Sequence, residues 1–178
     1  MHTRVVRLVF LSLAVLLPVA AFAQVTVTLP DTSQTTTLTA NVTEQATVTV
    51  PATVAFTVNN VSASTNSASQ SVTTSNVVLV DAKSLKISLQ ANAANFTAPA
   101  GGGTTWAASD VTWNAATWSN SGVGATGTLS NLAFNTVATC AANTSCSTTN
   151  LLFTLGAKST VARAGAHTLV VTWKFESI

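Results

Sequence analysis

The sequence predicts an all-β protein folded as an antiparallel two-sheet sandwich, and three observations favour this class. Apolar residues alternate with Thr, Ser and other polar residues over several short segments, polar or glycine-rich turns separate these segments, and no segment after residue 23 has a convincing helical pattern. A sandwich of the immunoglobulin-like or jelly-roll type buries the inward residues of both sheets and fits this spacing. A closed β-barrel is the competing architecture.

The expected strands follow from the alternation, taken in order along the chain. Residues 25–29 alternate Val or Leu with Thr, which places the two classes on opposite faces of a strand. The same reasoning predicts further strands at 35–42, 46–50, 54–58, 72–80, 85–90, 111–113, 126–134, 150–155 and 167–175. Leu85, Ile87 and Leu89 share one face of their strand and are candidate core residues.

Residues 1–23 have the pattern of a secretory signal peptide. Arg4 and Arg7 precede a run of Leu, Val and Phe, and Ala21-Phe22-Ala23 follows it, so cleavage is expected after Ala23. The apolar run is shorter than the roughly 20 residues that cross a bilayer as a helix, which disfavours a retained anchor. We therefore expect an exported protein with no integral membrane span after cleavage, located in the periplasm, at the cell surface or in the medium.

Residues 24–178 have the length of a single domain. The full chain has 7 Lys and Arg, so removal of Arg4 and Arg7 leaves five, which balance the 5 Asp and Glu. A nucleic-acid-binding protein needs a basic face that neutralises phosphates, and a formally neutral chain excludes that class. The scarcity of charge predicts a surface rich in hydroxyl and amide groups.

Cys140 and Cys146 are the two cysteines, and they enclose the polar segment Ala-Ala-Asn-Thr-Ser. An even number of cysteines in an exported chain favours a disulfide. Metal binding is disfavoured because further ligands are missing nearby, and redox catalysis usually uses Cys-x-x-Cys spacing. We expect a structural disulfide that closes this loop.

The sequence offers little for catalysis, and we expect a protein that is not an enzyme. His167 is the one histidine after cleavage, no Gly-x-Ser-x-Gly turn is present, and the acidic residues are scattered singly without an Asp-x-Asp cluster. An acid pair can arise only through folding. We expect no catalytic residues, no metal site and no cofactor.

The four tryptophans are the largest candidate contact residues. Trp173 shares a strand face with Val171 and Phe175, and Trp113 shares one with Val111, so both are expected in the core. Trp106 and Trp118 lie beside Gly-rich or Asn- and Ser-rich segments and are the candidates for exposed ligand contacts, since binding residues concentrate in loops. A carbohydrate-binding module that stacks sugars on these two residues is therefore one functional hypothesis.

The C-terminal half carries a family resemblance. Leu85-Lys86-Ile87-Ser88-Leu89, Trp106, Val111-Thr112-Trp113 and the stretch from Ala164 through His167-Thr168-Leu169-Val170-Val171-Thr172-Trp173 resemble the WxL-type surface domains of bacteria. Those domains are β-rich, extracellular and attached noncovalently to the cell wall. The resemblance implies a surface β-sandwich whose partners are components of the cell envelope.

A second resemblance is to subunits of bacterial surface fibres, which are similarly small, signal-bearing, poor in charge and rich in Thr, Ala, Val and Asn. In such a protein the alternating segment from Val25 onward can add a strand to a neighbouring copy, or it can pair within its own domain. Together these features predict an exported structural or cell-surface protein of the envelope or extracellular matrix. A fibre subunit assembled by strand addition is the alternative within that class.

Overall fold

The computed structural model describes residues 25–178, and the predicted signal peptide lies outside the described residues. The chain separates into two compact units, Met1–Ala40 and Asn41–Ile178. No strand forms within residues 25–40, where Leu29 and Leu38 are 82% and 91% exposed. We call Asn41–Ile178 the sandwich unit, and it is shorter than the predicted domain of residues 24–178.

The sandwich unit is built from short strands and one 3-10 turn. The strands are β1 (Gln45–Thr49), β2 (Thr65–Asn66), β3 (Gln70–Val78), β4 (Leu85–Ala91), β5 (Val111–Trp113), β6 (Val123–Gly124), β7 (Gly127–Thr128), β8 (Asn135–Thr139), β9 (Ser147–Leu151), β10 (Phe153–Leu155) and β11 (Val171–Ser177). The turn, η1 (Ala108–Asp110), leads directly into β5. None of the described residues forms a helix that is long and apolar enough to cross a membrane.

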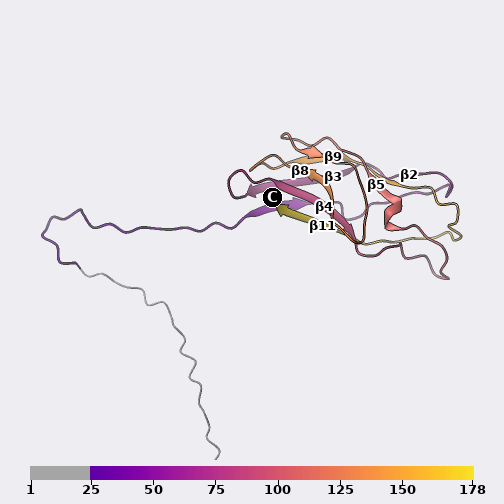
Figure 1. The fold of residues 1–178 in the computed structure, drawn as a ribbon, viewed down its shortest axis with the longest axis horizontal. Coiled ribbons are helices and arrows are strands. Elements are labelled where there is room, and N and C mark those ends of the chain that lie inside the picture. The colour runs from indigo at the N-terminus through magenta and orange to yellow at the C-terminus, as the bar shows by residue number, and fades with distance from the viewer. Residues whose placement is uncertain (1–24) are drawn as a thin grey trace, which may run out of the picture. The chain divides into compact units, whose positions relative to one another are not determined.

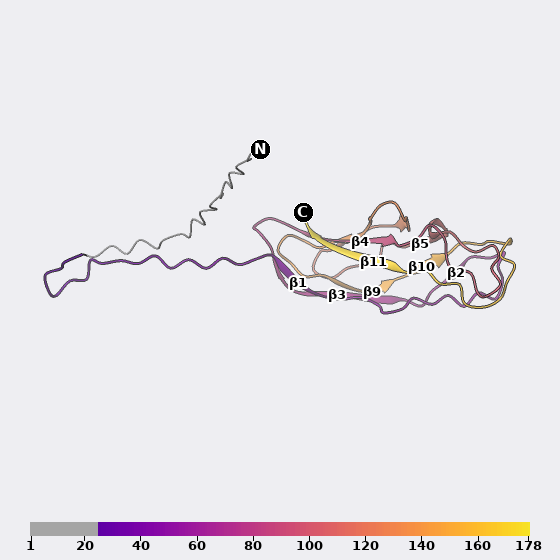
Figure 2. The same ribbon diagram turned by 90° about the horizontal axis from the view of Figure 1, so that it is seen from below.

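The strands form three antiparallel sheets, in the orders β1-β3-β9, β2-β10-β5-β7 and β11-β4-β8-β6. The first two are nearly continuous, because Leu152 alone separates β9 from β10 and the N–H of Ser67, between β2 and β3, donates to the carbonyl of Phe153 at 2.8 Å. Figure 1 shows β4 beside β11, and Figure 2 shows β4 in one layer with β1, β3 and β9 in the other. The predicted all-β sandwich is confirmed.

Apolar side chains from both layers fill the core between them. Leu85, Ile87 and Leu89 of β4 are buried as predicted, and they lie in one cluster with Val72 of β3 and Leu151 of β9. Ile87 pairs with Phe175 of β11 on one side and with Ala138 of β8 on the other, which centres β4 in its sheet. The alternation in residues 85–90 therefore marks the strand that the structure surrounds most completely.

Several predicted strands are missing or shortened in the structure. Segments 25–29, 35–42 and 54–58 form no strand, 126–134 contributes β7 at Gly127–Thr128, and 167–175 pairs continuously from Val171 onward. Alternation shows that a segment suits a pleated, half-buried surface, but a strand also needs a neighbouring edge with free N–H and C=O groups. The segments without a strand have the alternating pattern but no neighbouring strand edge to pair with.

Candidate functional site

The open side of the sandwich lies between two edge strands, β1 and β11. β1 pairs with β3, β11 pairs with β4, and each stands at the end of its sheet. Glu44, just before β1, accepts hydrogen bonds from the hydroxyl of Ser177 at 2.9 Å and from the backbone N–H of Val80 at 2.8 Å. This contact joins the start of β1 to the end of β11 and closes one end of the open side.

An apolar groove with a volume of about 1060 Å³ occupies this open side. Its rims are residues 50–58, which follow β1, and residues 161–171, which lead into β11. Its floor is made of apolar core side chains: Leu89, Trp106, Val111, Leu129, Phe153 and Leu155. The backbone N–H of Lys158 donates to the carbonyl of Val61 at 2.6 Å, and this bond joins the segments that adjoin the two rims at the other end.

The first rim has the side-chain pattern of a strand but lacks a strand partner. Val54, Phe56 and Val58 are half-buried against the core, whereas Ala55 and Thr57 are exposed. No backbone–backbone hydrogen bond connects residues 52–58 to any other described residue. This rim therefore presents a row of free N–H and C=O groups above an apolar floor.

Backbone hydrogen bonds fix the second rim near its C-terminal end, just before β11. Thr168 and Thr97 exchange backbone hydrogen bonds, and the carbonyl of Val170 accepts from the N–H of Asn92 at 2.9 Å. His167 lies in the same segment, where Nδ1 is 2.7 Å from the hydroxyl of Thr105 and Nε2 is 3.0 Å from the carbonyl of Arg163. These contacts assign His167 to anchoring the rim.

The core is incomplete along the groove. Val171, an inward residue of β11 that lines the groove, is 38% exposed, whereas Val72 and Ile87 in the interior are fully buried. Trp173, also on the inward face of β11 and in the groove lining, is only half-buried. One more strand between β1 and β11 would cover these side chains.

Two carboxylates hold the ends of the groove, and both have lowered pKa values. The hydrogen bonds from the Val80 N–H and the Ser177 hydroxyl lower the pKa of Glu44. Partial burial raises the pKa of Asp110, but hydrogen bonds from Lys158 at 2.8 Å and from the Ala107 N–H at 2.7 Å outweigh burial, so the pKa lies below its usual value. Each end of the groove is thus strongest when its carboxylate is ionised.

The groove is suited to an extended, apolar peptide. Arg163 and His167 are the ionisable residues of its described lining. The charge of a ligand therefore contributes little to its recognition. Free backbone groups along a rim recognise another strand by main-chain hydrogen bonds, and an apolar floor accepts every second side chain. A small-molecule pocket of this size would instead gather a few converging polar side chains.

The tryptophans correct one prediction. Trp106 and Trp118 were the candidates for exposed ligand contacts, but they are 4% and 5% exposed. The loops fold over these side chains. The indole N–H of Trp106 donates to the carbonyl of Gly156 at 2.9 Å. The Trp106 and His167 rings pack edge to face, with their centroids 5.2 Å apart. Trp113 is buried as predicted. The structure therefore offers no exposed Trp106 and Trp118 pair for stacking sugars.

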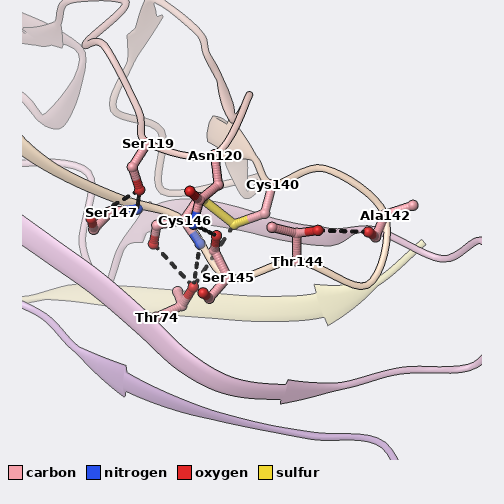
Figure 3. The surroundings of a disulfide bond; sticks show 9 residues. All are labelled: Thr74, Ser119, Asn120, Cys140, Ala142, Thr144, Ser145, Cys146 and Ser147. Atoms are coloured by element: carbon pink, nitrogen blue, oxygen red, sulfur yellow. Dashed lines mark hydrogen bonds between the residues drawn. A yellow bond between two sulfur atoms is a disulfide. The ribbon is translucent and has the colours of Figure 1, made fainter.

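The predicted disulfide between Cys140 and Cys146 is present. Cys140 follows β8 in one layer and Cys146 precedes β9 in the other, so the bond closes the loop where the chain crosses between layers. Figure 3 shows Thr74 of β3 beside it: the Thr74 hydroxyl donates to the carbonyl of Cys146 at 3.0 Å and accepts from its N–H at 2.9 Å. Cys140 donates from its N–H to the carbonyl of Leu85 at 2.9 Å. The disulfide is structural and lies outside the groove lining.

Other side-chain chemistry in residues 25–178 is sparse. No group of three or more His, Cys, Asp or Glu residues there is arranged to hold a metal ion. The chain matches no protein-family profile, no curated protein and no solved structure.

Proposed function

We propose that this protein is an exported, non-enzymatic structural subunit that associates with copies of itself by strand addition into the apolar groove. The observation that carries the proposal is the unpaired rim 52–58 beside a half-exposed inward face of β11. Export rests on the signal pattern of residues 1–23, and the Cys140–Cys146 disulfide fits an oxidising compartment. Envelope or extracellular matrix is the setting that these features favour.

The energetics favour a strand over a flat contact. Fully burying a Val, Leu or Phe side chain contributes about 1.5–3 kcal/mol, and the groove leaves Phe56, Val171 and Trp173 partly uncovered. An added strand covers them together and gives the rim backbone its missing hydrogen bonds. An unpaired sheet edge of this kind is otherwise a liability, which proteins normally cover or charge.

A matched pair of substitutions on β11 tests the proposal. Val171 faces the groove, whereas its neighbour Thr172 is exposed and lies outside the groove lining. Val171→Asp places a charge where the inserted strand must lie, and Thr172→Asp places the same charge on the opposite face. Light scattering of the mature chain over a concentration series reports the mass of the assembly, and circular dichroism confirms that both variants fold.

We expect the wild type and Thr172→Asp to assemble with rising concentration and Val171→Asp to stay monomeric. Equal assembly of both variants would show that copies associate through another surface. A wild type that is monomeric throughout, and that fails to sediment with envelope fractions, would overturn the proposed function.

A further inference from the structure

We infer that the strand received by the groove is residues 25–29 of a second copy of this chain. The inference rests on the proposed function and adds the identity of the inserted segment. In a pleated strand, Val25, Val27 and Leu29 point to one side and Thr26 and Thr28 to the other. The apolar side matches the groove floor, and the hydroxyl side matches a solvent-facing surface.

This segment belongs to none of the three sheets. Residues 25–29 form no strand, and Val25 and Leu29 are 59% and 82% exposed. Five residues in a strand span about 17 Å, and the unpaired rim 52–58 spans about 23 Å at the same rise per residue. The segment therefore fits along the rim, and it brings no charge into a groove whose lining carries almost none.

Residues 35–42 are the rival segment. Their alternating apolar side chains are Leu38, Ala40 and Val42, a smaller set than two Val and one Leu. Val42 belongs to the sandwich unit and stands three positions before Gln45, the first residue of β1, so the end of this segment stays within about 10 Å of its own β1. A domain of roughly 140 residues has a radius of gyration of about 14 Å. Residues 35–42 can therefore enter another groove only if the two units abut directly.

Residues 30–44 provide the reach that insertion into another copy requires. Fully extended, they span about 50 Å, which is more than the width of one such domain. Pro30 and Asp31 end the alternation, and Asp31 accepts hydrogen bonds from the N–H and the hydroxyl of Ser33, which forms a local turn after the segment. A long connection without strands is typical of a linker rather than of a loop inside one compact domain, which favours a second copy over the chain's own groove.

The test compares Val27→Asp with Leu38→Asp in the mature chain. Val27 and Leu38 are apolar residues of the two alternating segments, and both lie outside the sandwich unit. We expect Val27→Asp to raise the dissociation constant for assembly by at least about 100-fold and Leu38→Asp to change it less than about threefold. Because Val27→Asp keeps its groove, a fluorescent peptide of residues 24–30 should bind it, and the same peptide carrying Val27→Asp should not.

The outcomes separate this inference from the proposed function. If Leu38→Asp blocks assembly and Val27→Asp does not, the inserted segment is residues 35–42 and only the inference fails. If the wild type is monomeric and hydrogen exchange shows protected amides at 25–29, the segment fills its own groove and the second copy is excluded. If Val27→Asp, Leu38→Asp and Val171→Asp all assemble like the wild type, strand addition itself fails.

Discussion

The hydroxyl of Ser177 donates a hydrogen bond to Oε1 of Glu44 across 2.9 Å, joining the last strand to the residue that precedes the first. The same carboxylate oxygen accepts the backbone N–H of Val80 at 2.8 Å. One exposed side chain thus fastens three segments at the closed end of the groove. Because a carboxylate accepts these bonds better than a carboxylic acid does, the clasp depends on pH.

Acid should loosen this clasp. The folded-state pKa of Glu44 lies below its usual value because of the Val80 and Ser177 hydrogen bonds, so its contribution to stability is fully present above about pH 4.3 and is lost as pH falls through the folded pKa. We expect the protection factors of the amides of Ser177 and Ile178, taken relative to the intrinsic exchange rate at each pH, to fall over this range. Glu44→Gln should remove most of this pH dependence, and a profile identical to the wild type would contradict the assignment.

Asp110 and Lys158 hold the other end of the groove. Asp110→Asn removes the ion pair at 2.8 Å and weakens the bond from Ala107, so the free energy of unfolding should fall by about 1 kcal/mol, a modest value because both side chains are partly exposed. Since the folded-state pKa of Asp110 is lowered, this contribution is present above about pH 3.9 and lost below it. Urea denaturation at pH 7 and at pH 3 measures the difference, which should be smaller at the lower pH. Lys83→Met is the control, because Lys83 forms no ion pair among the described residues, and it should change stability at pH 7 by less.

Alternation in the sequence predicted the strands best where both neighbours exist. Residues 85–90 form most of β4, which pairs with a strand on each side. Cys140 and Cys146, on either side of a polar loop, form the predicted disulfide, which joins the two layers. The same pattern in residues 54–58 gives a rim without a ladder. Pairing partners are a property of the folded arrangement, so single-sequence alternation cannot distinguish a strand from a segment that awaits one.

The groove itself was not predictable from the sequence for a related reason. Its floor residues, from Leu89 to Leu155, come from strands far apart in the chain, and no local motif marks them as one surface. Trp106 and Trp118 were misplaced because neighbouring Gly, Asn and Ser residues suggest exposure, whereas the loops fold back over the rings. The proposed pairing of residues 25–29 with the unpaired rim depends on the open edge, which only the folded structure shows.

Removing the disulfide should destabilise the sandwich unit without abolishing assembly. The Cys140–Cys146 bond closes a ring of about seven residues, so the chain-entropy estimate is about 2–3 kcal/mol. Cys140→Ala with Cys146→Ala avoids burying new hydroxyls, because both positions are 1% exposed. We expect a folded, assembling protein with a lower urea midpoint. Loss of folding at 25 °C would mean that the hydrogen bonds of Thr74 cannot hold the crossing alone.

The buried tryptophans should differ in their tolerance of phenylalanine. Trp106→Phe removes the hydrogen bond to the Gly156 carbonyl, whereas the indole nitrogen of Trp118 has no partner among the described residues. Losing a buried hydrogen bond costs about 1–3 kcal/mol, while removing an unpaired donor relieves a desolvation cost. Trp106→Phe should therefore be the more destabilising by about 1–2 kcal/mol in urea titrations. Equal losses would show that packing alone determines both.

Trp173 should report directly on filling of the groove. It is half-buried on the inward face of β11 and lines the groove, whereas Trp118 is buried outside the groove lining. An inserted strand removes water from the Trp173 ring, so tryptophan emission should shift to shorter wavelength as the chain assembles. Trp173→Phe should abolish most of this shift and Trp118→Phe should retain it. A shift that survives Trp173→Phe while light scattering still shows assembly would mean that copies meet away from the groove, because Trp106 on its floor is already shielded from solvent.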